Sequence, residues 1–296
     1  MAIPETQLAT WSKQGAITTA KTTHEAVERA LRRHGPSVNY EVFLQGSYRN
    51  TTNIYGDSDV DVVAQLKSTF QPDLSALDST HQAAFHRAYP GSASYHWQNF
   101  RRDLLAALTA EFGPAAVTEG KKCLNVAGGN GRLSCDVVPC MEYRHYTSFT
   151  GVGPEQFIPG IIFWSQPDHR RIVNFPKPHY SNGVTKHQNT SKWFKPVVRM
   201  LKNARNAAIR KGYVIDGSAP SYFVECFVYN APRAAFGGSY DDSYCNIVKW
   251  WANEDLSNLS CQNGVTPLFG NTPEQWSETA AKQLISGLTG LWNDWR

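Results

Sequence analysis

Apolar residues recur at helical spacing in three stretches of the first half of the chain. The first stretch covers residues 7–33 and is followed by Gly35 and Pro36, a pair that ends helices. The other two stretches lie near 74–89 and 97–112. Each pattern predicts an amphipathic helix, and the first helix is expected to be long and N-terminal.

Three further segments of the first half are typical of strands. YEVFLQ (40–45) stops at a Gly-Ser turn, DVDVVAQL (59–66) alternates polar and apolar residues, and RLSCDVVPCMEY (132–143) follows a glycine-rich turn at 128–131. Residues 144–190 are rich in proline, glycine and aromatic residues and show little periodicity. We expect this last segment to be an irregular connection.

The second half of the chain has a helical pattern. Four segments carry apolar residues at helical spacing: 195–211, 221–231, 240–253 and 273–293. A mixed half followed by a helical half predicts an α+β protein. We expect a first domain over residues 1–190, including the N-terminal helix, and a helical lobe over residues 191–296.

Composition excludes some classes of protein. With 296 residues, of which 41% are hydrophobic, the chain can bury a sizeable core. No segment approaches the ~20 apolar residues of a membrane span, and the polar start lacks the layout of a secretory signal, so we expect a cytoplasmic protein. The 6 cysteines form no C-x-x-C pair, which favours buried free thiols over a zinc site. A net charge of +4 suits a protein that holds triphosphates but is small for a nucleic-acid groove.

The strand pattern at 59–66 places two carboxylates together. Asp59 and Asp61 are two residues apart, so they face one side of a strand while Val60 and Val62 face the other. Two adjacent carboxylates repel each other unless a cation lies between them, and Mg²⁺ prefers oxygen ligands that it shares with substrate phosphates. The pair is therefore a candidate metal platform, although an Asp-x-Asp sequence is often only a solvated strand face.

Two other features fit the same chemistry. Gly46 and Ser47 end the preceding strand, where a glycine permits close approach of a phosphate and a serine adds a hydroxyl donor. Asp136 lies among apolar residues in a strand pattern, where a charge is costly unless it has a partner, and a shared metal ion would supply one. A turn or an Asp–Arg pair would explain each feature alone. Their order and spacing together favour a catalytic site.

The spacing from Gly-Ser to Asp-x-Asp to a later aspartate resembles the nucleotidyltransferase superfamily with a polymerase-β-like palm. The segments FLQGSYRNTTNIYGDSDVDVV, RIVNFPKPHYSNG, FKPVVRMLKNAR and APSYFVECFVYNAP resemble the bacterial cGAS/DncV-like nucleotidyltransferases, and among them the CdnE group. The resemblance extends over nearly the whole chain. It implies a palm with a mixed sheet, an N-terminal spine helix and a C-terminal helical lobe that closes the nucleotide pocket.

The resemblance also implies roles for residues of the first half. By this resemblance, the carboxylates of Asp59, Asp61 and Asp136 bind two Mg²⁺ ions, and Mn²⁺ can take their place. Nucleotide phosphate is held by the turn Gln45, Gly46 and Ser47. Asn174 is expected to choose the base, because its amide can both donate to and accept from a pyrimidine edge, and CdnE-like enzymes with asparagine here are associated with uridine. The alternative is that Asn174 only caps a loop.

Further nucleotide contacts are implied in the helical half. Lys195, Arg199 and Lys202 lie at i, i+4 and i+7 and so form one cationic stripe on a helix. Lys202 resembles the family lysine that binds the donor triphosphate, and Lys195 is the second candidate. Ser221 is expected to contact phosphate and Tyr222 to stack on a base, although a tyrosine at this position could equally belong to the core.

The resemblance implies an enzyme that joins two nucleoside triphosphates into a cyclic dinucleotide and releases pyrophosphate. The favoured substrates are UTP and ATP, giving cyclic UMP–AMP, with cyclic dipyrimidines next. Kinship also implies bacterial antiphage (CBASS) defence, in which a separate effector protein responds to the product, without a requirement for nucleic acid. We expect a monomer. The alternatives are an RNA- or protein-directed nucleotidyltransferase and a nucleotide sensor without catalysis.

Overall fold

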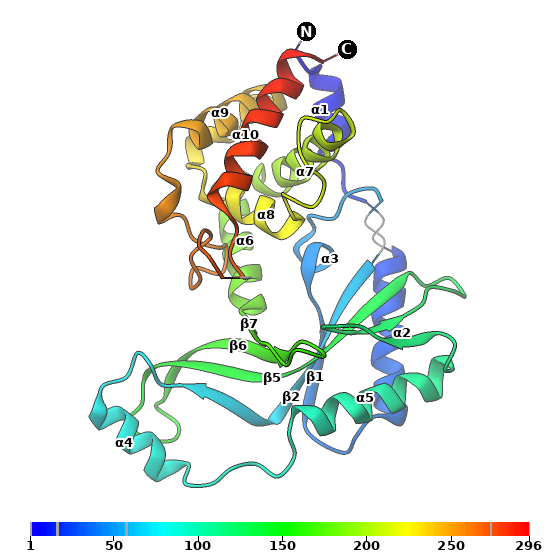
Figure 1. The fold of residues 1–296 in the computed structure, drawn as a ribbon, viewed down its shortest axis with the longest axis vertical. Helices are drawn as coiled ribbons and strands as arrows, with labels where there is room; N and C mark the ends of the chain where they lie inside the picture. Colours follow the sequence, from blue (N-terminus) through cyan, green and yellow to red (C-terminus); the bar gives the residue numbers. More distant parts are fainter. Residues whose placement is uncertain (1, 16–17, 57–58, 273, 296) are drawn as a thin grey trace. The chain divides into compact units, whose positions relative to one another are not determined.

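The computed structural model describes residues 2–15, 18–56, 59–272 and 274–295. The chain divides into two compact units (Figure 1). The helical unit comprises Met1–Ala16, Arg49–Asp57 and Pro178–Arg296, and the sheet unit comprises Ile17–Tyr48 and Ser58–Lys177. Both units are discontinuous in sequence, so residues 178–190 group with the helical unit, whereas the expected domain boundary falls after residue 190.

The sheet unit is built on one mixed sheet in the order β1-β2-β5-β4-β3, with β6 on β5 and β7 on β6. Strands β2 and β5 are parallel and all other pairs are antiparallel. The strands are β1 (Tyr40–Leu44), β2 (Asp59–Asp73), β3 (Val117–Glu119), β4 (Leu124–Val126), β5 (Ser134–Ser148), β6 (Gln156–Trp164) and β7 (Arg171–Asn174). This confirms the three predicted strands and the α+β class.

The prediction of an irregular connection over 144–190 is wrong. Strand β5 continues to Ser148, and β6, β7 and helix α6 (Pro176–Asn189) follow. Pro159 and Gly160 lie inside β6, and Ile161 and Ile162 beside them are buried. The apolar residues therefore determine the structure of this segment in spite of its turn-forming residues.

Three helices accompany the sheet: α2 (Thr18–His34), α4 (Ser79–Ala88) and α5 (Trp97–Phe112). Helix α2 packs on α5, as the two amphipathic patterns require. Trp97 at the start of α5 is fully buried, and its indole nitrogen donates a hydrogen bond to the carbonyl of Pro139 in β5 at 2.7 Å. This contact fixes α5 against the strand that carries Asp136.

The single helix predicted over 7–33 is instead two helices, α1 (Glu5–Trp11) and α2, which belong to different units. The interruption is centred on Gly15, whose amide donates to the carbonyl of Asn53 at 3.1 Å. A Cβ at Gly15 would lie 2.6 Å from the carbonyl oxygen of Ile54, so the backbone can approach only because this residue is glycine. Residues 16 and 17 of the predicted helix lie outside the described part of the chain.

The helical unit contains α1 and most of α6, together with α7 (Phe194–Arg210), α8 (Ser221–Asn230), α9 (Tyr240–Asn253) and α10 (Glu278–Asn293). Helix α1, drawn in blue in Figure 1, lies beside α7. The core includes Phe227 of α8, which stacks on Trp251 of α9 with ring centroids 4.1 Å apart. The 6 cysteines are free thiols; four are buried, as predicted, while Cys123 and Cys245 are half-buried. Among the described residues, no helix has the length and apolar content to cross a membrane.

Candidate active site

The parallel pairing of β2 with β5 brings the three predicted carboxylates together. Asp61 lies directly opposite Asp136 in the register, and Asp59 lies opposite Ser134. Residues two apart on a strand, and partners on adjacent strands, point to the same face of a sheet. Asp59, Asp61 and Asp136 therefore share one face, while Val60 and Val62 are fully buried on the other.

Short hydrogen bonds hold the carboxylates of Asp136 and Asp59. The Asn125 amide on β4 donates to Asp136 Oδ1 at 2.5 Å, and the Ser134 hydroxyl donates to Asp59 Oδ1. Burial raises the pKa of the Cys123 thiol to about 12, and the negative charge of Asp136 adds to that shift. This face of the sheet is therefore electronegative and favours a cation.

The turn predicted to hold phosphate lies against the same face. The short helix α3 (Gly46–Asn50) begins at Gly46, whose φ of 68° is a left-handed conformation that favours glycine. The amide of Gln45 donates to the carbonyl of Asp61 at 2.9 Å. A Cβ on Gly46 would overlap Oδ2 of Asp61, so the glycine leaves the space that this carboxylate occupies.

Gly46→Ala is expected to displace the Asp61 carboxylate and to lower kcat at least about tenfold, because misplacement of a catalytic group by less than an ångström is already costly. Left-handed strain will also lower stability by about 1–3 kcal/mol. The measurements are steady-state kinetics and thermal unfolding. Gly113→Ala is the matched control, since Gly113 has φ 84° and nothing within 4 Å of an added Cβ. Equal kcat in the two variants would contradict a special role for Gly46.

The donor set on this face fits Mg²⁺ or Mn²⁺, since all three side chains offer carboxylate oxygen. Within the described ranges, no three His, Cys, Asp or Glu side chains are arranged as a ready-made metal site. A closed protein cage is not required, because Mg²⁺ keeps several waters and takes only one or two carboxylates together with substrate phosphate.

Gln45, Ser47 and Asn174 also belong to the sheet unit. The Gln45 side-chain oxygen is buried and accepts no hydrogen bond from the described residues. Ser47 is half-buried in the first turn of α3. Asn174 is the last residue of β7 and pairs with Ile161. To the described residues its side-chain amide makes no hydrogen bond, so the loop-cap alternative has no structural support.

Ser221 and Tyr222 begin helix α8 in the helical unit. Ser221 Oγ accepts a hydrogen bond from Arg205 at 3.1 Å. Tyr222 is 43% exposed, which argues against a core tyrosine, and its ring stacks on His179 with centroids 5.3 Å apart. Burial raises the pKa of its hydroxyl, with smaller contributions from the neighbouring thiols of Cys226 and Cys261. Tyr222 therefore lies beside two thiols and the His179 ring and is still partly exposed.

The predicted cationic stripe on α7 is not a uniform surface. Lys195 is half-buried with its ammonium 5.8 Å from the centroid of the Tyr180 ring, and burial lowers its pKa. Arg199 donates to the carbonyls of Ser12 and Thr51. Lys202, the first candidate for the triphosphate, is 1% exposed and pairs with the Glu225 carboxylate at 3.1 Å. Only Lys195 forms no ion pair and no hydrogen bond from its ammonium within the described residues.

Sequence reasoning missed Glu225 and His179. Glu225 is the one acidic residue in the apolar helix SYFVECFVYN, and the argument that singled out Asp136 would have found it too. His179 carries no such signal, because its importance comes from its contacts with Glu225 and Tyr222.

The chain is similar to known proteins over its whole length. Residues 181–293 match the C-terminal helical domain of the cGAS/DncV-like nucleotidyltransferases. The chain is 44% identical to a cyclic UMP-AMP synthase of Rhodothermus marinus, covering 100% of this chain and 99% of that protein. It is 34% identical to the cyclic nucleotide synthase CdnE01 of Staphylococcus haemolyticus, covering 100% of each.

A solved structure of the Rhodothermus marinus CdnE c-UMP-AMP synthase with Apcpp and Upnpp matches with a TM-score of 0.90, covering 99% of this chain and 97% of that one. The fold is that of a nucleotidyltransferase. The chain belongs to the cGAS/DncV-like nucleotidyltransferase family, in its CdnE group.

Proposed function

We propose that this protein joins UTP and ATP into a cyclic dinucleotide, with both bonds formed at the face that carries Asp59, Asp61 and Asp136. The observation that supports this best is the register of β2 and β5, in which Asp61 lies opposite Asp136 with Gly46 packed against the Asp61 carboxylate. The proposal is further supported by its relative in Rhodothermus marinus, which is a cyclic UMP-AMP synthase.

In the proposed reaction, the ribose 3′-oxygen of one nucleotide forms a bond to the α-phosphorus of the other. The bond to pyrophosphate breaks, and the hydroxyl proton is lost to water. Two Mg²⁺ ions held by the three aspartates would make the hydroxyl a better nucleophile and stabilise the charge of the leaving group. A second identical step on the linear intermediate then closes the ring.

The chain's own residues bind and orient the nucleotides. Gln45, Gly46 and Ser47 would receive phosphate, where the backbone of a glycine allows close approach. Lys195 and Ser221 are the preferred triphosphate ligands in the helical unit, because Lys195 requires no rearrangement, whereas Lys202 would first have to loosen its pairing with Glu225. Tyr222 presents an accessible ring for stacking on a base. Most of the catalytic effect would come from positioning and charge.

Asn174 is proposed to select uridine. Relatives differ in product, since a protein of Elizabethkingia meningoseptica that is 35% identical over 91% of this chain is a cyclic dipurine nucleotide synthase. Base choice thus differs among related chains, and the amide of Asn174 makes no hydrogen bond within the described residues, which supports its availability to a base.

Asn174→Ser is expected to reduce the preference for UTP over purine triphosphates by about 5- to 150-fold, because a lost base contact costs about 1–3 kcal/mol. Competition between UTP and GTP at fixed ATP measures this ratio. Asn189→Ser, at the end of α6, is a matched control. An unchanged ratio in Asn174→Ser would refute the role of this residue without affecting the synthase assignment.

The biological setting is proposed from kinship. CdnE-type synthases imply bacterial antiphage (CBASS) defence in the cytoplasm, with a separate effector that responds to the dinucleotide. No nucleic acid would be required, and the enzyme would act as a monomer. Residues 1–190 and 191–296 would be the catalytic core and the lobe that completes nucleotide binding.

The experiment is incubation of the purified protein with Mg²⁺ and all four ribonucleoside triphosphates, each α-labelled in turn. Phosphatase-resistant label from UTP and ATP alone would establish the synthase and its base choice. Label from purine nucleotides alone would leave a synthase and refute the uridine proposal. Label in material of high molecular mass that appears only with added RNA would favour an RNA-directed nucleotidyltransferase instead.

A further inference from the structure

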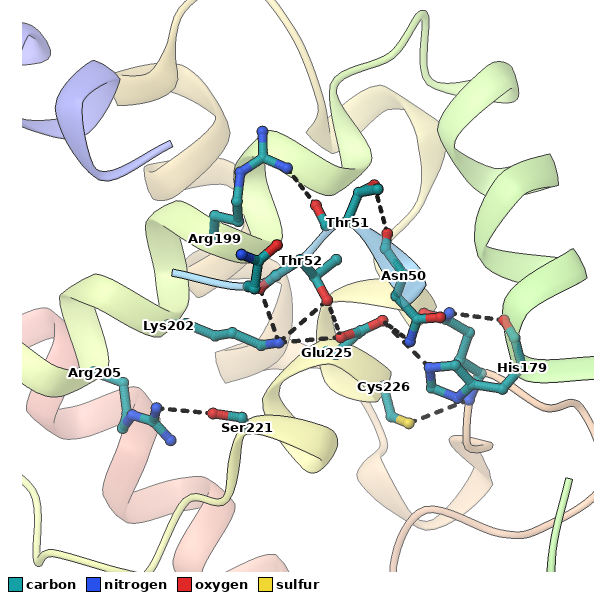
Figure 2. A network of polar contacts seen from close by, with 12 residues as sticks. Asn50, Thr51, Thr52, His179, Arg199, Lys202, Arg205, Ser221, Glu225 and Cys226 are labelled. Atoms are coloured by element: carbon teal, nitrogen blue, oxygen red, sulfur yellow. Dashed lines mark hydrogen bonds and ion pairs between the residues drawn. The ribbon is translucent and has the colours of Figure 1, made fainter. Parts of the chain in front are cut away.

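One buried carboxylate in the helical unit has four partners from three segments of the chain: residues 50–52, helix α6 and helix α7 (Figure 2). Glu225 on α8 is 3% exposed. Its Oε1 accepts from the Asn50 amide at 3.0 Å and contacts His179 Nε2 at 3.2 Å. Its Oε2 accepts from the Thr52 hydroxyl at 2.6 Å and from the Lys202 ammonium at 3.1 Å.

Burial alone would raise the pKa of Glu225, but the charge of Lys202 and hydrogen bonds from His179 and Thr52 lower it below its ordinary range. The carboxylate is therefore ionised in the folded protein. Well-packed apolar residues can replace a buried ion pair with little loss of stability, so such a pair is weak evidence for a stabilising role. A carboxylate that binds four polar groups from three segments is better explained by the segments that it holds in place.

The first thing it holds is the connecting segment, residues 50–54, between α3 and β2. Thr52, Asn53 and Ile54 are at most 2% exposed, although they form no helix or strand. Arg199 and Lys202 also bind carbonyls of this segment, those of Thr51 and Thr52. In sequence, the segment joins the Gly46–Ser47 turn to the strand that starts at Asp59.

The second thing it holds is the support beneath Tyr222. The His179 ring is 6% exposed, contacts Glu225 through Nε2, and stacks on Tyr222 at an interplanar angle of 23°. An aromatic ring with a fixed partner on one face loses less freedom when a base binds to it. Glu225 thus acts on both the connecting segment and the ring proposed to bind a base.

We infer that Glu225 is a positioning residue for nucleotidyl transfer, which fixes the connecting segment 50–54 and the His179–Tyr222 stack through one carboxylate. The inference rests on the proposed function. It assigns Glu225 no contact with substrate, so its removal should change the order of these two segments first and turnover as a consequence.

The test compares Thr52→Val with Thr52→Ser, since valine keeps the shape of threonine and removes the donor to Glu225, while serine keeps the donor. Hydrogen exchange of residues 49–56 and kcat at saturating UTP and ATP are measured on folded protein. For the valine variant we expect exchange to rise and kcat to fall, each at least about tenfold. In the serine variant, hydrogen exchange and kcat should both stay near their wild-type values. Valine and serine variants that match in both quantities would overturn the inference.

Glu225→Gln tests the second branch and is compared with Glu142→Gln. Glu142 in the sheet unit is 4% exposed and pairs with Lys67 and Arg144, so it matches Glu225 in burial and in its pairing with a positive charge. Both variants should lose stability. Only Glu225→Gln should also raise the hydrogen exchange of residues 178–183 and the KM for nucleotide, each at least about tenfold. Equal effects in both variants would overturn the inference.

The two proposals fail differently. A wild-type protein that forms no dinucleotide refutes the proposed function, while hydrogen exchange still decides whether Glu225 orders the two segments. An active wild type whose Thr52→Val variant behaves like Thr52→Ser refutes only the role of Glu225.

Discussion

Asp61→Asn is expected to lower dinucleotide formation roughly 10³-fold or more while the protein remains folded. Asparagine keeps the shape of the side chain and removes the negative charge that a divalent ion requires. Among the three aspartates, Asp61 has the most constrained place, opposite Asp136 and against Gly46. The Asp61→Asn substitution also relieves repulsion between like charges, so we expect the unfolding temperature to stay unchanged or to rise.

Initial rates with UTP and ATP, together with thermal unfolding, measure both effects. Asp73→Asn is the control on the same strand, since Asp73 ends β2 and binds Tyr143 and His145. Those contacts lower the pKa of Asp73 in spite of its burial, so its loss should reduce stability and preserve turnover. An Asp61→Asn enzyme within about tenfold of wild type would contradict the assignment of this face.

Lys202→Met is expected to lower the free energy of unfolding by about 3–5 kcal/mol, because it leaves the Glu225 carboxylate buried without its counter-charge. Lys202 is 1% exposed and Glu225 is 3% exposed, so water cannot replace the lost charge. Denaturant unfolding at neutral pH measures the loss directly.

Lys195→Met is the matched control on the same helix. Lys195 forms no ion pair with the described residues, so this substitution should change the free energy of unfolding by less than about 1 kcal/mol. It should instead raise the KM for nucleotide, as expected for a triphosphate ligand. A Lys202→Met protein as stable as Lys195→Met would mean that the pair with Glu225 contributes little to folding.

The local sequence pattern was enough to predict the strands that carry the three aspartates. The alternation at 59–66 predicted that Asp59 and Asp61 share a face, and the structure places them on one strand with the valines buried. The position of Asp136 directly opposite Asp61 could not be predicted in this way. The two strands are separated by α4, α5, β3 and β4, and the register between them depends on packing across the whole sheet.

The predictions that were wrong failed because tertiary contacts overrode the local sequence pattern. Helical periodicity continues through residues 7–33, but the contact of Gly15 with Asn53 and Ile54 separates two helices. The stripe on α7 follows correctly from spacing, yet burial depends on what packs against it, and Thr52 and Glu225 cover Lys202. Spacing identifies the face of a helix, while tertiary contacts decide which of its charges reach solvent.

The most direct measurement for the central claim is the ratio of pyrophosphate released to dinucleotide formed from UTP and ATP, with the product identified by mass. If one aspartate face makes both bonds, two pyrophosphates are released for each product, the product carries no terminal phosphate, and Asp61→Asn abolishes both signals. One pyrophosphate for each product that retains a triphosphate, or full activity in Asp61→Asn, would contradict the account.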